Sequence, residues 1–482
     1  MKNISFNDDR DYQYFCVFRD QTAFELAGGF DPSLWRTLVV EACNNESIRE
    51  LTTAVAALNI ADKQSKSATG ESRNSQNDMN SNLEYALLQY GKALKGIQNT
   101  VSAGQDSMRI ALIAALLIFV FESLHGDTTR ALTPIQISID LILKRLSTMH
   151  RPYRGSLTNA KKTPSSLPVD EDLLIAFVRL DGVALSLIRK PSIKLTQLLD
   201  QPIALSSTGN YCEIPSGFAT ISEARKYLDD ISWRSEAIPE QLSGTLRSCY
   251  IDIMDKNSDS TENQLLKWIE AFAPLFQHSL TPAGSAGFMT ATILQVSALS
   301  QILFVTSFEN QEANHMTQTI ISLTKRLVEY PNFSKRFVFD AGVLPAMIIL
   351  IIFSPQKEAK EEAYELVRAM TPRREGYWSS VAIAKAASKL LKKGEEKNFG
   401  TSSAGQLIDS RLRGLEFDTF MGEDMYDFGM QGINVEDEEM IDPKLSGPGP
   451  SQVDKGKAGE YYTFRNHLKM DPDFFKEFLG VS

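Results

Sequence analysis

The sequence of 482 residues predicts an all-α protein, either a multi-helix bundle or an irregular helical array. Apolar residues recur at spacings of three and four along most of the chain, as they do on one face of an amphipathic helix. Strand-like alternation of apolar and polar residues, bounded by turn residues, is scarce. The composition agrees, because 43% hydrophobic and 23% charged residues are typical of a soluble globular protein with a large core.

The predicted helices follow one another in twelve segments, each justified by apolar residues at spacings of three and four. In chain order they are 32–44, 47–61, 82–101, 106–124, 128–146, 171–189, 221–233, 264–278, 291–308, 313–329, 357–370 and 378–393.

Segment 106–124 is the clearest single element. Asp106 or Ser107 can cap its N-terminus, and apolar residues cover every side, so we expect it inside a stack of helices. His125 in the last turn and Gly126 just beyond, which tolerates positive φ, should end it. We therefore interpret His125 as a capping or core residue rather than a metal ligand or a base.

Two apolar runs, 110–121 and 343–353, are shorter than the roughly 20 residues that a membrane-spanning helix needs. We interpret both as buried core helices and expect no membrane partner.

The predicted domain organisation has three parts. Residues 1–394 form an all-α body with polar, mobile loops at about 63–81 and 154–168, and 206–216 is a third candidate connection. Residues 395–460 are rich in Gly, Ser and acidic residues and should be flexible. Residues 461–482 regain aromatic residues and could form a short C-terminal helix.

The four cysteines, Cys16, Cys43, Cys212 and Cys249, are scattered singly. This spacing argues against a secreted disulfide scaffold and fits a reducing compartment such as the cytosol or nucleus. Residues after Met1 are polar and charged, so we expect no secretory signal.

The formal net charge of −10 comes from a single short stretch of the chain. Between Leu415 and Pro443 there are ten acidic residues and no Lys or Arg, and the rest of the chain has 50 acidic and 50 basic residues. A balanced body argues against a large basic face that binds nucleic acid.

The acidic stretch 415–443 has the composition of a disordered activation segment. Its aromatic and Met residues fall at steps of three, one, four and three, on one face of a transient helix: Phe417, Phe420, Met421, Met425 and Phe428. Acidic neighbours keep such residues in water until a partner groove buries them. We predict that these five residues contact a transcriptional coactivator. The alternative is an acidic tail packed on the body.

The usual catalytic signatures HExxH, GxSxG and GxGxxG do not occur, and the five histidines have no metal-ligand spacing. Glu171-Asp172 and Glu361-Glu362 begin helices and are best interpreted as partners of the helix dipole. We therefore predict no catalytic residues, no cofactor and no metal site, and a protein that is not an enzyme.

Five segments together resemble the regulatory region of fungal binuclear zinc-cluster transcription factors, whose patterns include "YxxAL", "LIACLLFxxFE" and "P..RREG.WDS". They are FDPSLWRTLV (30–39), YALLQYGKAL (85–94), GQDSMRIALIAALLIFVFESLHG (104–126), GDTTRALTPIQ (126–136) and RREGYW (373–378). The likeness runs from about residue 14 to 391. It implies an all-α body that restrains or exposes an activation segment and responds to a protein partner or a small-metabolite effector.

One departure from the family is decisive for DNA binding. The family's DNA-binding module needs six cysteines that hold two zinc ions, and this sequence contains no such module. We expect no DNA binding by the zinc cluster. Either the protein regulates transcription through protein contacts, or a cysteine-rich exon lies upstream of Met1.

The leading hypothesis is therefore a fungal transcriptional regulator that acts in the nucleus through protein contacts. A second hypothesis is a helical scaffold or adaptor, located in the cytoplasm, for which the acidic stretch is a docking peptide. A third is an α-helical enzyme with an unrecognised site. The sequence does not indicate an oligomeric state.

Overall fold

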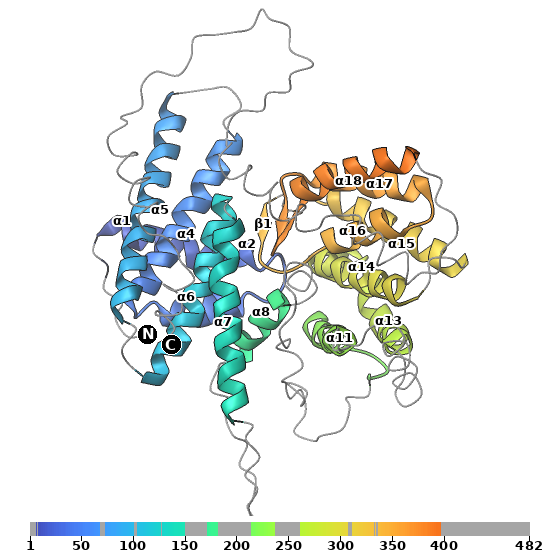
Figure 1. The fold of residues 1–482 in the computed structure, drawn as a ribbon, viewed down its shortest axis with the longest axis horizontal. Coiled ribbons are helices and arrows are strands. Elements are labelled where there is room, and N and C mark those ends of the chain that lie inside the picture. Colours follow the sequence, from blue (N-terminus) through green and yellow to red (C-terminus); the bar gives the residue numbers. More distant parts are fainter. Residues whose placement is uncertain are drawn as a thin grey trace, which may run out of the picture.

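The structure is a computed structural model that describes residues 6, 8–67, 73–100, 104–126, 128–149, 171–181, 214–236, 261–306, 311–331, 333 and 336–396. Within these residues the protein is almost entirely helical, with one small three-stranded sheet, so the all-α prediction is confirmed. Figure 1 shows two groups of helices side by side, which we call the first lobe (described residues up to 181) and the second lobe (described residues from 214).

The first lobe consists of helices packed around one apolar core. Its elements are α1 (Asp9–Val17), the π-helix η1 (Phe18–Thr22), α2 (Ala23–Leu26), the π-helix η2 (Leu34–Val39), α3 (Val40–Ala42), α4 (Glu46–Ser67), α5 (Arg73–Thr100), α6 (Gly104–His125), α7 (Thr128–Met149) and α8 (Glu171–Asp181).

Helix α6 lies at the centre of this lobe, as its all-round apolar surface predicts. Every residue from Ala111 to Phe121 is at most 5% exposed. The predicted end of the helix is confirmed: His125 is its last residue, and Gly126 follows with φ +100° while its N–H donates to the Glu122 carbonyl. The His125 ring lies parallel to that of Phe121.

Helices α4 and α5 form a long antiparallel hairpin, and here one prediction was wrong. We expected a mobile loop over 63–81, but α4 continues to Ser67 and α5 begins at Arg73, so the prediction was wrong at both ends, while residues 68–72 lie outside the described residues. The polar residues 63–67 at the end of α4 and 73–81 at the start of α5 include neither Gly nor Pro. Such residues extend an established helix at little cost, even where no apolar face is present.

The second lobe has two apolar clusters of its own. Its elements are α11 (Ile221–Glu236), α13 (Thr261–Ser279), the 3₁₀-helix η3 (Pro282–Gly287), α14 (Phe288–Val305), α15 (Gln311–Val328), β1 (Phe337–Val338), α16 (Leu344–Phe353), α17 (Lys357–Met370), β2 (Arg374–Glu375), β3 (Trp378–Ser379) and α18 (Ser380–Glu396). The bounds of α17 are those that the sequence predicts.

The small sheet joins the two lobes. Strand β1 pairs parallel with β2, which pairs antiparallel with β3. Three aromatic residues of this region, Phe337, Phe339 and Tyr377, belong to the core of the first lobe, where their rings lie 5.2–6.1 Å from that of Phe119. Residues far apart in the sequence therefore complete one core, and Figure 1 shows β1 between the two lobes.

Among the described residues, two stretches have the length and composition that would allow them to cross a membrane, Met108–His125 and Pro282–Phe304. Within this fold 72% and 67% of these stretches are buried. Their apolar side chains pack against neighbouring helices, as do those of α16, which lies in the predicted core run 343–353.

Several predictions fall outside the described residues. These are the connections 154–168 and 206–213, the end of the predicted helix 171–189, the flexible segment 397–460, the acidic stretch 415–443 and the C-terminal segment 461–482.

Candidate functional site

The motif residues of the first lobe form a buried polar frame between helices. Tyr85 and Gln89 of α5 both donate to Oδ1 of Asp11, which is 9% exposed on α1. The next residue, Tyr90, donates a 2.7 Å hydrogen bond to Oε1 of Glu122 on α6. Tyr90 also stacks on Phe121 with ring centroids 3.9 Å apart. Because buried polar groups must be paired, these contacts fix the register of α5 against α1 and α6.

Two charges of the RREG segment are buried in the second lobe. Arg373 and Glu375 are 2% and 0% exposed and form a 2.6 Å ion pair. The other carboxylate oxygen of Glu375 accepts hydrogen bonds of 2.8 and 2.9 Å from the N–H groups of Gly342 and Leu344. Leu344 begins α16, so the carboxylate stabilises the unpaired donors and the positive end of that helix.

The next arginine of the same segment reaches the other lobe. Nη1 of Arg374 donates a 2.8 Å hydrogen bond to the carbonyl of Ser123, in the last turn of α6. A cation at this end of a helix is favoured by the helix dipole. Burial lowers the pKa of Arg374, and Asp62 opposes that shift. Gly376 follows with φ +55°, a conformation that favours glycine, and so forms the turn between β2 and β3.

A pocket of about 440 Å³ lies where the two lobes meet. The first lobe supplies residues 27–35 and one face of α8. The second lobe supplies the first turns of α11, the residues where η3 passes into α14, and the loop after β1. Its volume lies within the range of about 300–1,000 Å³ that is usual for small-molecule sites. We take this interlobe pocket as the candidate functional site.

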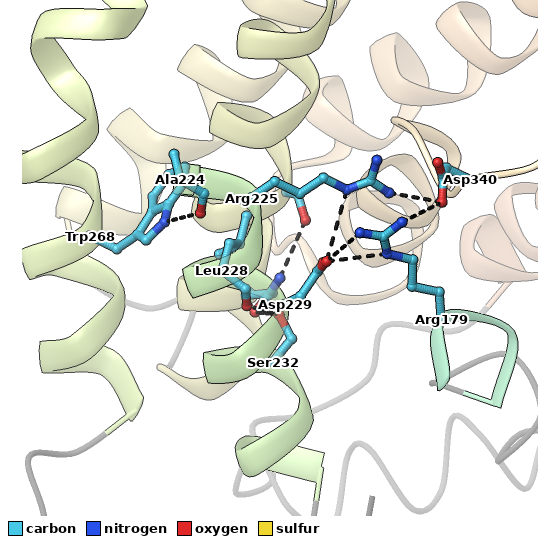
Figure 2. A network of polar contacts seen from close by, with 10 residues as sticks. Arg179, Ala224, Arg225, Leu228, Asp229, Ser232, Trp268 and Asp340 are labelled. Atoms are coloured by element: carbon cyan, nitrogen blue, oxygen red, sulfur yellow. Dashed lines mark hydrogen bonds and ion pairs between the residues drawn. The ribbon is translucent and has the colours of Figure 1, made fainter. Parts of the chain in front are cut away.

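Four charged side chains form a network in the pocket (Figure 2). Arg179 of α8 donates 2.8 and 3.2 Å hydrogen bonds to Oδ2 of Asp229 and lies 3.5 Å from Oδ1 of Asp340. Arg225 of α11 lies 2.8 Å from Asp340 and 3.9 Å from Asp229. All four side chains are between 10% and 26% exposed. The network therefore connects α8, α11 and the loop after β1 while its own charges cancel.

The surroundings keep the network ionised. Burial opposes the charge on Asp340, but the attraction of Arg225 and then of Arg179 is larger and lowers the pKa of its carboxyl group. Burial likewise opposes the charge on Arg179, and the carboxylates of Asp229 and Asp340 outweigh it and raise the pKa. Neither Asp340 nor Arg179 is therefore poised to exchange a proton near neutral pH.

The Phe30 ring covers one side of the network, because the guanidinium carbon of Arg225 lies 3.8 Å from its centroid. Such a cation–π contact orients the side chain of Arg225 toward Asp340. Next to it, Leu34, Ile175 and Ile221 give the pocket an apolar wall. The site combines a rigid charged floor with apolar sides and is suited to binding.

The described residues offer no cluster of side chains suited to a metal ion. Over the described residues, no group of three or more His, Cys, Asp or Glu side chains could hold a metal ion. Cys43 is buried, donates to the Val39 carbonyl, and its pKa is raised to about 12 by burial. A thiol in this state is a poor zinc ligand.

The sequence-predicted contact residues Phe417, Phe420, Met421, Met425 and Phe428 lie outside the described residues. The pocket was missed from the sequence because its walls come from segments that extend from residue 27 to residue 340. One residue gave a partial signal: Asp172 was interpreted as a dipole partner of its helix, and it also lines the pocket.

Comparison with known proteins gives one match. Residues 12–178 match the family described as the fungal specific transcription factor domain. No curated protein and no solved structure matches the chain. The matched range covers most of α1 and continues to α8, and it includes the segments around Tyr90 and Glu122.

The family is not one of enzymes, and in general it implies a nuclear role. The match thus indicates a role in the regulation of transcription. The resemblance to the regulatory region of fungal transcription factors is confirmed over residues 12–178, which are similar to the fungal specific transcription factor domain.

Proposed function

We propose that the protein regulates transcription in the nucleus through contacts with other proteins. The observation that carries this proposal is the family match over residues 12–178. In the proposed organisation, the helical body up to about residue 394 is the regulatory part. The segment after it presents the acidic stretch 415–443 to a coactivator.

The proposed contact surface consists of five apolar side chains among acidic ones. Phe417, Phe420, Met421, Met425 and Phe428 fall on one face if the segment becomes helical on a partner. Ten acidic residues keep the stretch in water in the absence of a partner, and Gly422 and Gly429 disfavour a helix in isolation. Binding then supplies the free energy that orders the segment.

The cysteines of this sequence do not fit the binuclear zinc cluster of the family that the sequence resembles. Six thiolates would be needed, and the sequence has four cysteines. Of these, Cys43 is buried in the core of the first lobe and Cys16 lies on α1. The proposal therefore includes no zinc-dependent DNA contact by these residues, and it assigns target recognition to protein partners.

A reporter assay tests the proposed activation segment. Residues 405–443 are fused to an unrelated DNA-binding domain, and we expect the reporter to be activated. Replacing Phe417, Phe420 and Phe428 by Ala should abolish activation. A matched control replaces Ile433 and Val435 by Ala, which removes apolar side chains outside the proposed face and should leave activity unchanged.

Localisation of the full chain tests the rest of the proposal. A fluorescent fusion should accumulate in the nucleus of a fungal cell. A silent reporter together with a strictly cytoplasmic fusion would contradict the proposal and favour an adaptor with an acidic docking peptide.

A further inference from the structure

We propose that the interlobe pocket binds a small organic amine, a molecule with an ammonium group on an apolar aromatic or aliphatic body. This inference goes beyond the transcriptional role and does not depend on the acidic stretch. It rests on the volume of the pocket, the charges that line it, and the side chains that form its walls.

The charges of the pocket favour a cation. Five acidic and three basic residues line it. The four residues of the network cancel one another, and Asp230 has a partner of its own, which leaves Asp31 and Asp172 against Lys226 around the rim. The carboxylates at the rim therefore favour a cation over an anion, and a low-dielectric cleft focuses their field on its contents.

The arginines of the floor do not offer an anion site. Arg179 and Arg225 each contact both carboxylates of the network, at 2.8–3.9 Å. A carboxylate or phosphate ligand would have to displace Asp229 or Asp340 and leave a partly buried charge without its partner. Breaking such a pair is strongly unfavourable, so the floor acts as a fixed neutral surface.

The walls suit an apolar body. Phe30, Leu34 and Ile175 are partly exposed at the pocket, and Ile221 lies across from them on the second lobe. With the ammonium group at the rim carboxylates, the remainder of the ligand would be buried against these side chains. The free energy gained is proportional to the apolar area removed from water.

The position of the pocket makes its occupancy measurable. Both lobes supply walls, so a ligand would contact each of them and stabilise their native arrangement. Any molecule that binds the folded state alone raises the midpoint of thermal unfolding as its concentration rises. The melting temperature of the full chain is therefore a direct readout, independent of reporter activity.

The test uses two matched sets of probes on the full chain. Tryptamine, indole-3-ethanol and indole-3-propionate share one aromatic body, while hexylamine, hexanol and hexanoate share an aliphatic one. We expect tryptamine or hexylamine to raise the melting temperature to a plateau, and the neutral and acidic analogues to have little effect. Isothermal titration calorimetry then gives the affinity.

Three variants locate the binding site. Asp172→Asn and Asp31→Asn remove exposed rim charges and should each weaken amine binding about five- to tenfold. Ser222→Trp fills the pocket from an exposed position on α11 and should abolish binding. Glu312→Gln, an exposed residue on α15 that does not line the pocket, is the matched control and should bind as the wild type does.

Three results would overturn the proposal: no saturable shift with either amine, an equal shift in the Asp31, Asp172 and Glu312 variants, or tighter binding of the carboxylates than of the amines. If Ser222→Trp fails to fold, the two rim variants decide alone, because their positions are exposed and their substitutions conserve volume.

Discussion

The guanidinium group of Arg374 donates a 2.8 Å hydrogen bond to the backbone carbonyl of Ser123, which precedes it by 251 residues. The contact joins the sheet of the second lobe to the C-terminal turn of the central helix of the first. Tyr377, three residues later, packs on Phe119 of the same helix. One short segment therefore holds the two lobes together through a polar and an apolar contact.

We predict that Arg374→Ala destabilises the protein by about 1.5–3 kcal/mol, the usual contribution of a hydrogen bond to a charged group. The Ser123 carbonyl, at a partly buried position, loses its donor, and the helix dipole of α6 loses its cation. Urea unfolding measures the change. The control is Arg368→Ala, which removes an exposed ion pair with Glu365 and should cost no more than about 1 kcal/mol. Equal effects of the two variants would show that the contact between lobes contributes little.

We predict a larger effect for Glu375→Gln, about 3–5 kcal/mol, because Arg373 would remain buried without its charged partner. The same change weakens the two hydrogen bonds at the start of α16. The double variant Arg373→Met/Glu375→Gln should recover part of the loss. Urea unfolding of Glu375→Gln, Arg373→Met and the double variant gives the coupling energy between the two residues. Strictly additive losses would contradict the buried pair.

Glu50 on α4 predicts a pH dependence of stability. Burial, followed by repulsion from Glu46, raises its pKa from about 4.5 to about 7. The folded protein therefore binds a proton here that the unfolded chain releases, and this contribution to stability is lost as the pH rises from about 4.5 to 7.

The check is the free energy of unfolding of wild type and Glu50→Gln at pH 5 and pH 8. The variant should be relatively more stable at pH 8, by on the order of 1–2 kcal/mol, because the half-buried group is partly screened by solvent. An unchanged difference between the two pH values would show that Glu50 has an ordinary pKa.

The central helix α6 should not tolerate a charge. Ala115 is 1% exposed, so Ala115→Asp places an unpaired carboxylate in the core. We expect an insoluble or unfolded protein, judged by recovery in the soluble fraction and by thermal melting. Leu88→Asp, at a 55% exposed position of α5, is the matched control and should remain soluble with a cooperative transition. A cooperatively melting Ala115→Asp protein would contradict the position of α6.

Helices with a strong apolar period could be predicted closely from the sequence. The bounds of α17 are those expected, and those of α6 differ by two residues at the start and one at the end. The period fails where a helix has no apolar face: the polar ends of α4 and α5 were expected to be a loop. There, each added residue extends an already formed helix by one backbone hydrogen bond. The spacing of apolar residues in the sequence does not indicate such bonds.

The interlobe pocket could not be predicted, for a different reason. Its charged floor joins Arg179, Arg225, Asp229 and Asp340, and only the pair on α11 has a recognisable spacing of four. The contact of Arg179 with Asp340 depends on how two lobes pack, which no local pattern encodes. Tyr90 and Glu122 are similar: both stand out within their motifs, yet the hydrogen bond between them appears only in the folded protein.

The aromatic residues Phe337, Phe339 and Tyr377 also bear on how the protein is made. A ribosome completes residues 12–178, the range that matches the family, long before it adds these three residues. During that interval the face of Phe119 that they cover lacks its native neighbours. The nascent first lobe is therefore an incomplete folding unit that exposes apolar surface, a state prone to aggregation and suited to chaperone binding. An expression fragment that ends near residue 181 would remain in that state permanently.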